Sequence, residues 1–346
     1  MKIIVDAMGG DYAPFEIVKG AIMATDDFNV DIILVGRGEE ILRSIEKMGM
    51  KNIPKGIEIA HTSDVVTMED DPSTVIREKK DSSLTVALGL LRDGGGDALV
   101  SAGNTGALLS GSTLLVKRIR GIRRAALAPV LPEGFGNCIM IDSGANTECT
   151  PEYLLQFAYM GTSFAKKVLG KESPRVALLN IGTEESKGPP LQKETYKLLM
   201  EAKEKGKLNF IGNIESRNIL NQQADVIVSD GFSGNVLLKT MEGTALYFIG
   251  AMKDIFRKNA LTKLSALLVK KSIRDLKRKM DYSEVGGSVL LGISKPVVKA
   301  HGSSEANAIR GAIGQSVKMV ASGFVSDITD NIRDMKISTD NDEKNS

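Results

Sequence analysis

Six short stretches rich in glycine, serine, threonine, asparagine and aspartate are the parts of this sequence best suited to chemistry. They are VDAMGGD (5–11), VSAGNTGA (100–107), DSGANTE (142–148), NIGTEESKG (180–188), SDGFSGN (229–235) and KAHGSS (299–304). Each follows a short apolar run that is typical of a buried strand, and most lead into a helical pattern. The unpaired N–H groups of such a turn bind anions, and glycine allows close backbone approach. The stretches therefore indicate a site for an anion such as phosphate.

The candidate binding residues are the polar and glycine positions of these stretches. Hydroxyls and amides can donate hydrogen bonds to an anion, whereas carboxylates repel phosphate and are expected to hold loop amides or a cation. Any single turn is explained equally well by a helix N-cap, and the argument for a site is that six occur together. The candidates are Asp6, Gly9, Gly10, Asp11, Ser101, Gly103, Asn104, Thr105, Asn146, Thr183, Glu184, Asp230, Ser233, Ser303 and Ser304.

Several other kinds of active site lack their residues in this chain. There is no G-x-x-x-x-G-K-[ST] stretch, no G-x-G-x-x-G after the first strand and no G-x-S-x-G turn. Cys138 and Cys149 have no adjacent histidine, and the two histidines, His61 and His301, stand in no metal-ligand cluster. Metal catalysis, a P-loop, ordinary dinucleotide binding and a covalent acyl-enzyme are therefore disfavoured, and we expect phosphate to be a group of the substrate.

The elements that must position these residues follow an alternating pattern of strand and helix. This pattern predicts an α/β fold with a doubly wound, mostly parallel sheet, in which the six stretches share the carboxyl edge of the strands. We expect one domain over residues 1–326, a helical arm within it over about 233–280 and a polar, disordered tail over 327–346. The expected strands are 3–5, 32–35, 57–59, 98–100, 138–141, 176–181, 210–211, 226–228 and 297–299, and the expected helices include 39–48, 84–92, 151–168 and 191–205.

Composition limits the class of protein. The chain has 346 residues, of which 42% are hydrophobic and 25% charged, as in ordinary globular proteins. A formal net charge of +2 gives no general attraction for nucleic acid. Two cysteines indicate a reducing compartment, and we find neither a signal peptide nor an apolar run that could span a membrane. A cytoplasmic location is expected.

The predicted arm is strongly basic. Residues 253–279 contain ten lysines and arginines against two aspartates, a local excess of +8. Apolar residues lie between the charges, as in a helix that binds an anionic membrane surface or an acidic partner protein. A dimer-forming helix with solvated lysines is an equally good interpretation. The candidate contact residues are Leu261, Leu264, Leu268, Lys270, Lys271 and Arg274.

Taken together, the six stretches and MDYSEVGG (280–287) resemble the PlsX family of phosphate acyltransferases over about residues 2–320. One departure is Tyr12, where the family often has histidine. The resemblance implies a fold like that of isocitrate and isopropylmalate dehydrogenases, a homodimer and no cofactor. It also implies transfer of a fatty acyl group from acyl carrier protein to inorganic phosphate. The acyl phosphate would serve a membrane glycerol-3-phosphate acyltransferase, and the enzyme would associate peripherally with the membrane.

For this reaction, three side chains are the candidate catalytic residues. Lys187 is the only cation inside its stretch and is expected to hold phosphate or stabilise the oxyanion, with a solvated surface lysine as the alternative. Asn235 can donate its amide to the carbonyl oxygen or cap a helix. His301 can protonate the leaving thiolate or only order its loop.

Two other functions remain open from the sequence. The first is a phosphotransacetylase-like enzyme that uses acyl-coenzyme A. The second is a non-catalytic scaffold for a lipid surface or an acyl carrier, built on the basic arm. The scaffold would leave the six polar stretches without a role.

Overall fold

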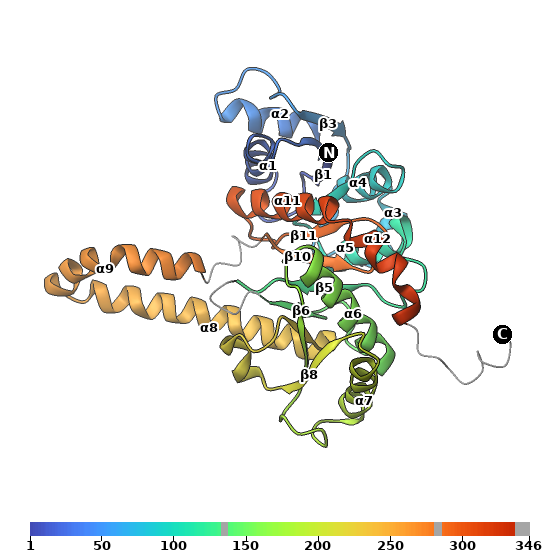
Figure 1. Cartoon of the computed structure of the whole chain (residues 1–346). Helices are drawn as coiled ribbons and strands as arrows, with labels where there is room; N and C mark the ends of the chain where they lie inside the picture. The colour runs from blue at the N-terminus through green and yellow to red at the C-terminus, as the bar shows by residue number, and fades with distance from the viewer. Residues whose placement is uncertain (133–137, 280–285, 336–346) are drawn as a thin grey trace.

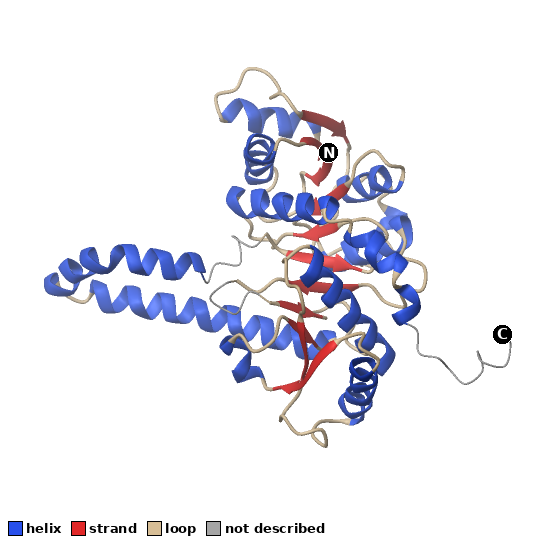
Figure 2. Ribbon diagram, viewed as in Figure 1, coloured by secondary structure: helices blue, strands red, loops and turns tan. Residues whose placement is uncertain are grey.

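Short runs of valine, isoleucine and leucine form the buried strands at the centre of the fold, as their pattern predicts. The computed structural model describes residues 1–132, 138–279 and 286–335. Within these residues the strands form two sheets, one of seven strands and one of four, with helices on both faces (Figure 2). The prediction of a doubly wound, mostly parallel α/β fold is confirmed.

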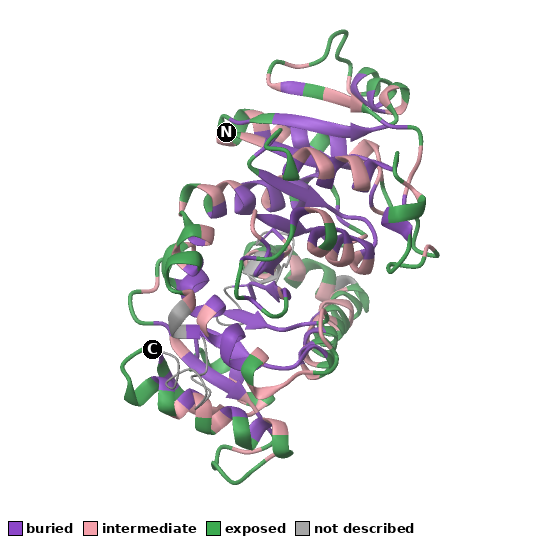
Figure 3. Ribbon diagram, turned by 90° about the vertical axis from the view of Figure 1, so that its right-hand side faces the viewer, coloured by how far each residue is buried: buried purple, intermediate pink, exposed green. Residues whose placement is uncertain are grey.

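The larger sheet contains both the first and the last strand of the described residues, with one strand, residues 98–101, between them. All its neighbouring strands are parallel except at β10, which is antiparallel to both of its neighbours. Most of its strands are buried, as Figure 3 shows in purple, and this explains their continuous apolar sequences, whereas the edge strand at residues 57–61 is only partly buried. In order across the sheet they are β3 (Ile57–His61), β2 (Asp31–Gly36), β1 (Lys2–Asp6), β4 (Ala98–Ser101), β11 (Val297–Lys299), β10 (Ser288–Leu291) and β5 (Ala126–Pro129).

Helices cover both faces of the larger sheet. Ile3 and Val5 of β1 pack in the core beneath the helices at one face, whereas Ile4 between them packs with Leu84 and Leu88 at the other. The first face is covered by α1 (Phe15–Phe28) and α11 (Ala306–Ala321), which pack against each other, and the second by α4 (Ser83–Arg92) and α5 (Thr105–Gly111). The remaining elements here are α2 (Gly38–Lys47), α3 (Val75–Glu78) and η1 (Ser112–Val116).

The smaller sheet is parallel throughout. Two clusters of the core include side chains from its helices. One contains Phe157, from the helix after the first strand, and the other contains Leu238, from the first helix of the arm. The strands in order are β6 (Ile139–Ile141), β9 (Val226–Val228), β7 (Arg175–Leu179) and β8 (Asn209–Ile214). Their connections contain α6 (Pro151–Lys167), α7 (Pro190–Glu204) and η3 (Ser216–Asn221).

The two sheets run in opposite directions where they meet. Because β10 is antiparallel to both β11 and β5, the strands β11 and β5 end at the same edge. An antiparallel bridge between Val130 and Ile139 joins the end of β5 to the start of β6. After β6, the N–H of Ser143 donates to the carbonyl oxygen of Leu127, near the start of β5, at 2.9 Å. The loops after β6, β7 and β9 therefore lie at the edge opposite to the loops after β1, β4 and β11.

This reversal corrects one prediction. The six polar stretches do not share one edge, because three lie at each of two opposite edges. The physical reason is the direction of pairing: β10 leaves β5 parallel to β11, and the antiparallel contact between β5 and β6 then reverses the strand direction without any local signal in the strand sequences.

The helical arm has the predicted form. Its helices are α8 (Gly231–Arg257) and α9 (Ala260–Lys279), which lie side by side and project away from the sheets (Figure 1). The predicted break near Asn259 is present. The Asn259 side chain accepts the N–H of Thr262 at 2.9 Å, and Thr262 Oγ1 accepts the Asn259 N–H at 3.0 Å, which caps the start of α9.

Two other expectations differ from the structure. Strands β5 and β10 are absent from the sequence prediction, and β7 ends at Leu179, leaving Ile181 77% exposed. The polar tail begins later than residue 327, because α12 (Phe324–Asp330) and η4 (Ile332–Met335) follow, and Ile328 and Met335 are buried. Residues 336–346 of the expected tail lie outside the described residues.

Candidate functional site

The carboxylate of Asp6 is the centre of a buried polar cluster at the end of β1. It accepts hydrogen bonds from Ser83 Oγ at 2.6 Å and Ser101 Oγ at 2.7 Å, and from the N–H of Met8 at 3.3 Å. Burial raises the pKa of Asp6, and these hydrogen bonds and nearby Lys299 oppose the rise. We call this group, together with the loops after β4 and β11, the Asp6 cluster.

The glycines of the Asp6 cluster bring three loops into contact. A Cβ atom on Gly9 would lie 2.6 Å from the backbone N of Gly103 and 2.7 Å from Asp6 Oδ2. Gly10 has a φ of 111°, which favours glycine, and the neighbouring Asp11 N–H donates to the Gly302 carbonyl oxygen at 2.8 Å. Three of the six stretches expected at one site, 5–11, 100–107 and 299–304, meet here.

Asn104 and Thr105 begin α5 beside this cluster. The Asn104 Oδ1 accepts the N–H of Ala107 at 3.0 Å, and its Nδ2 donates to the carbonyl oxygen of Thr67 at 3.2 Å. Asn104 is therefore the N-cap of α5 and a tie to the loop after β3. The capping interpretation of this residue is supported by its contacts.

Lys299 is the last residue of β11 and is buried, with 8% of its surface exposed. Its Nζ donates to the carbonyl oxygen of Ala102 at 3.2 Å and to that of Ala300. Burial lowers the pKa of Lys299 to about 8, and Asp6 and Asp11 oppose this effect. The ammonium thus ties the loop after β4 to the loop after β11.

His301 lies at the exposed mouth of the Asp6 cluster. Its Nδ1 accepts the N–H of Ser303 at 3.3 Å and lies 2.9 Å from Ser303 Oγ. Because the backbone N–H must donate, Nδ1 is an acceptor, and the neutral ring carries its proton on Nε2. Partial burial, and secondarily Lys239, lower the pKa of His301. Ser304 is buried behind it, and its N–H donates to the His301 carbonyl oxygen at 3.0 Å.

A second polar cluster lies at the opposite edge, after β6. The buried carboxylate of Asp142 accepts the N–H of Asn146 at 2.6 Å and its Nδ2 at 2.9 Å, together with N–H groups of Ser143, Gly144 and Ala145. Burial raises the pKa of Asp142, and these hydrogen bonds oppose the rise. We call this group, with the start of α8, the Asp142 cluster. Its hydrogen bonds hold a loop in shape, so its carboxylate has a structural role.

The start of α8 joins the Asp142 cluster through Asp230. The Asp230 side chain caps the helix by accepting the Ser233 N–H at 2.8 Å, and the N–H of Gly231 donates to the Asn146 carbonyl oxygen at 2.7 Å. Asn235 is therefore not the cap. Its exposed amide instead faces the Gly144 loop, with its Oδ1 3.7 Å from the position of a Cβ on Gly144.

One face of α8 connects the two clusters. Asn235, Lys239 and Glu242 are spaced four and three residues apart, so they lie along one side of the helix. Lys239 and Glu242 form an ion pair of 2.7 Å, and both act electrostatically on His301. At 1.5 Å per residue, α8 covers about 13 Å between Asp230 and Lys239. Asn235 thus lies between the two edges.

Lys187 lies apart from these contacts, in the loop between β7 and α7. It is exposed, its N–H donates to the Glu184 carbonyl oxygen at 3.1 Å, and its own carbonyl oxygen accepts Asn180 Nδ2 at 3.1 Å. Thr183 and Glu184 of the same loop are also exposed. This loop belongs to the smaller sheet, so its residues do not join the Asp6 cluster through any described contact.

Three residues of the Asp6 cluster and its surroundings were missing from the sequence prediction. Ser83 comes from the start of a helix far along the chain, and no local pattern connects it to Asp6. Lys239 could have been found from its helical spacing to Asn235. Lys299 was part of the KAHGSS stretch, and a lysine that ends a buried strand is itself an unusual signal.

Neither cysteine belongs to these clusters as a nucleophile. Cys138 is buried in the core beside β6, and burial raises its pKa to about 12. Burial, and then the charge of Asp142, raise the pKa of Cys149 to about 12 as well. Both thiols therefore remain protonated at neutral pH. Within the described residues, no group of three His, Cys, Asp or Glu side chains could hold a metal ion.

Comparison with known proteins identifies the family of this fold and its loops. The model of the fatty acid synthesis protein family matches residues 1–327. A phosphate acyltransferase from Thermoanaerobacterium thermosaccharolyticum is 47% identical over 328 residues, which cover 95% of this chain and 96% of the relative. The chain belongs to this family. The predicted resemblance to phosphate acyltransferases is thereby confirmed over both sheets and the arm.

Solved structures similar to this family member share its fold at low sequence identity. A phosphotransacetylase from Streptococcus pyogenes has a TM-score of 0.63 and 18% identity, covering 93% of this chain and 94% of its own. A structure described as a 4-hydroxythreonine-4-phosphate dehydrogenase from Salmonella typhimurium has a TM-score of 0.54 and 13% identity, with coverages of 92% and 99%. The expected dehydrogenase-like architecture is confirmed by the fold alone.

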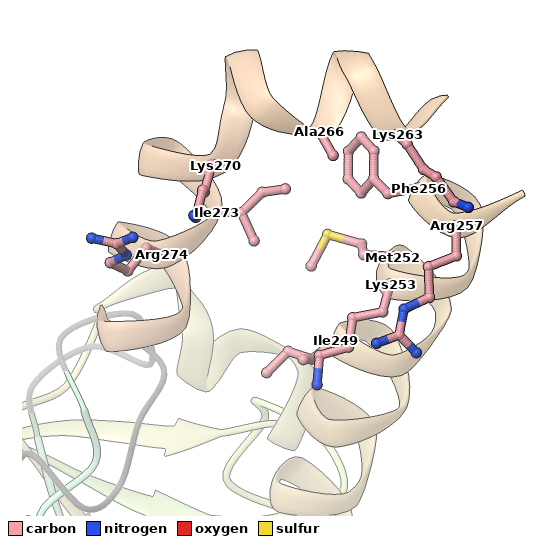
Figure 4. Close-up of a pocket in the computed structure, with 10 residues that line it drawn as sticks. All are labelled: Ile249, Met252, Lys253, Phe256, Arg257, Lys263, Ala266, Lys270, Ile273 and Arg274. Carbon is pink, nitrogen blue, oxygen red and sulfur yellow. The ribbon is translucent and has the colours of Figure 1, made fainter. Parts of the chain in front are cut away.

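The arm of this family member presents both apolar and cationic side chains. Leu261, Leu264 and Leu268 of α9 are 79%, 62% and 85% exposed. Between α8 and α9 lies a hollow of about 420 Å³, lined by apolar side chains of both helices and by Lys270 and Arg274 (Figure 4). Lys271 is also exposed. Among the described helices, none has the length and apolar character needed to cross a membrane.

Proposed function

We propose that this phosphate acyltransferase family member transfers a fatty acyl group from acyl carrier protein to inorganic phosphate. The products are an acyl phosphate and the free thiol of the carrier. The proposal is supported by the family, by the curated relative named phosphate acyltransferase, and by the Asp6 cluster. The observation that carries it is the contact between the glycine loops after β1, β4 and β11.

These loops suit phosphate more than a nucleotide. Gly9 and Gly103 allow the loops after β1 and β4 to pack together without a side chain between them, which favours a site built from backbone groups. Ser303 provides a hydroxyl nearby, Lys299 provides a cation, and His301 lies at the entrance. A small, strongly charged anion matches this compact set of donors.

The reaction needs no strong base. A phosphate oxygen attacks the thioester carbonyl carbon, the C–O bond forms, and the tetrahedral intermediate collapses with cleavage of the C–S bond. Monohydrogen phosphate carries one proton, which ends on the released thiolate, so the acyl phosphate leaves as a dianion. Alignment of the two reactants and stabilisation of the oxyanion then provide most of the rate enhancement.

His301 suits the leaving group. Its neutral ring has Nδ1 fixed by Ser303 and a proton on Nε2, which can donate a hydrogen bond to the sulfur as the C–S bond breaks. The lowered pKa of His301 keeps this tautomer at neutral pH. Asn235, on the same face of α8 as Lys239, is our candidate for the side chain that donates its amide to the carbonyl oxygen.

Lys187 remains our candidate for a second cation that holds phosphate or the oxyanion. It is exposed and lies in the loop between β7 and α7, so it would reach the substrate from the side of the smaller sheet. Lys187→Ala tests this role: turnover and phosphate affinity that both stay unchanged would remove Lys187 from the mechanism.

The arm is the proposed docking surface. Acyl carrier protein is acidic, and the ten cations of residues 253–279 complement it. The exposed leucines of α9 further support contact with an anionic membrane, where a glycerol-3-phosphate acyltransferase would use the acyl phosphate. On these grounds we propose peripheral association with the membrane, and from the family resemblance we propose a cytoplasmic homodimer.

The choice of acyl donor tests the proposal. Purified protein is supplied with inorganic phosphate and one of palmitoyl acyl carrier protein, palmitoyl-coenzyme A or acetyl-coenzyme A, and acyl phosphate is trapped with hydroxylamine. We expect product from the carrier protein thioester at a much higher kcat/KM than from either coenzyme A thioester. Preference for acetyl-coenzyme A would instead favour a phosphotransacetylase, and no product from any donor would favour the scaffold.

A further inference from the structure

Lys299 is a buried ammonium whose hydrogen-bonding capacity is only partly used. A lysine ammonium has three N–H donors. Two of them go to the carbonyl oxygens of Ala102 and Ala300, which leaves the third without a partner among the described residues. Both carbonyls belong to loops of the Asp6 cluster.

The charge of Lys299 is also incompletely balanced. The titratable groups that act on it are Asp6 from β1, Asp11 from the following loop, Lys239 from α8 and His301 from its own loop. Among the described residues, no carboxylate forms an ion pair with it within 4.0 Å. The carboxylate of Asp6 is already engaged by Ser83 and Ser101. A buried charge without a close counter-ion is costly, and this cost explains its pKa of about 8.

A bound anion would complete the hydrogen bonding of Lys299 and balance its charge. It would accept a hydrogen bond from the third N–H of Lys299, and it would supply the negative charge that no carboxylate of the described residues provides at ion-pair distance. The surrounding loops are already shaped for close backbone approach by Gly9, Gly10 and Gly103. A neutral ligand would leave the charge unbalanced.

We propose that Lys299 is the buried cation of the phosphate site, holding the loops after β4 and β11 with two N–H groups and the substrate phosphate with the third. This inference rests on the proposed function, because it names the residue that binds the phosphate of that reaction. It assigns the first contact with phosphate to the larger sheet, which leaves Lys187 in the smaller sheet as a candidate for contact with the oxyanion.

Phosphate binding to the full-length protein tests the assignment directly. Isothermal titration calorimetry with inorganic phosphate is carried out on wild type, on Lys299→Met, which removes the charge and keeps the chain length, and on Lys318→Met. Lys318 is an exposed lysine of α11 and serves as the control. We expect Lys299→Met to weaken phosphate binding by at least about tenfold, the effect of one charged hydrogen bond, and Lys318→Met to leave it unchanged.

A second measurement uses only the wild-type protein, so it does not depend on the folding of a variant. At pH 8.5 a large fraction of Lys299 is deprotonated, so binding of an anion to its charged form must be accompanied by proton uptake. Sulfate does not titrate in this range, and its binding to wild type is measured in two buffers that differ in ionisation enthalpy. We expect uptake of up to about one proton per site at pH 8.5 and little at pH 6.5.

The outcomes separate this inference from the proposed function. Sulfate binding without proton uptake, or phosphate affinity unchanged in a folded Lys299→Met, would overturn the role of Lys299 while wild type still makes acyl phosphate. Wild type that neither binds phosphate nor makes acyl phosphate would overturn both.

Discussion

Gly9 and Gly103, on the loops after β1 and β4, approach so closely that a Cβ atom on Gly9 would lie 2.6 Å from the backbone N of Gly103. The same Cβ would lie 2.7 Å from the buried carboxylate of Asp6. Backbone atoms and a fixed carboxylate cannot move aside easily. The shape of the Asp6 cluster therefore depends on the absence of a side chain at this position.

Gly9→Ala is expected to impair the binding of phosphate more than any other step of the reaction. The added methyl must push apart the loops after β1 and β4, at a cost of about 1–3 kcal/mol. We expect the KM for phosphate to rise at least tenfold, as measured by acyl phosphate formation at saturating acyl donor. Gly89→Ala in α4 is the matched control, since a Cβ there meets no atom within 4 Å. An unchanged KM in folded Gly9→Ala would contradict the location of the phosphate site.

The two histidines should differ in their effect on the pH profile. Partial burial and Lys239 lower the pKa of His301 from 6.5, so its ring is neutral at pH 7 and activity should fall only as pH drops below that range. Protonated Nδ1 can no longer accept the Ser303 N–H. We expect His301→Gln to lose about 10²-fold in kcat and to lose the histidine contribution to the acid limb, measured as kcat against pH.

His61→Gln provides the control for this profile. His61 lies on β3, where its Nδ1 accepts the N–H of Gly38 at 3.2 Å. Because phosphate itself titrates near neutral pH, each variant is compared with wild type at the same total phosphate. The role of His301 would be excluded if its variant kept the wild-type profile and kcat.

Neither thiol is expected to react in the native protein. Burial raises the pKa of both Cys138 and Cys149 to about 12, so the thiolate that attacks a disulfide reagent is scarce at pH 8. We expect little reaction with an aromatic disulfide reagent in buffer and release of two equivalents in urea. Rapid labelling of Cys149 in the folded protein would contradict this account and reopen a covalent cysteine mechanism.

The leucines of α9 should control attachment to membranes. Leu264→Glu with Leu268→Glu removes two exposed apolar side chains from the arm, each contributing about 1.5–3 kcal/mol when buried. We expect at least tenfold weaker binding to anionic vesicles in flotation. Leu42→Glu with Leu220→Glu changes two exposed leucines outside the arm and should bind as wild type. Intact vesicle binding by the α9 variant, with its oligomer preserved, would exclude this surface.

Local sequence patterns predicted the elements of this fold well because each pattern depends on neighbouring residues. The continuous apolar run at Ile3, Ile4 and Val5 requires burial on both faces, and β1 has it. The arm and its break at Asn259 follow from helical spacing and a capping side chain. Strand direction is different, because it depends on partners distant in the sequence. The antiparallel strands β5 and β10 were therefore missed, together with the reversal between the sheets.

The candidate site was predicted in part for the same reason. Glycine and hydroxyl stretches after strands identified Asp6, Gly9, Ser101 and Gly103, and the structure brings them together. The sequence could not separate these residues from those at the opposite edge. Ser83 reaches Asp6 from a distant helix, and the importance of Lys299 becomes visible only when its burial is known.

The direct transfer of the acyl group to phosphate is tested by following two products in one time course. Purified protein receives palmitoyl acyl carrier protein with and without inorganic phosphate, and both acyl phosphate and the free carrier thiol are quantified. We predict equal amounts of the two products when phosphate is present and neither when it is omitted. Thiol release without phosphate, or release that exceeds acyl phosphate from the first turnover, would contradict attack by phosphate on the thioester.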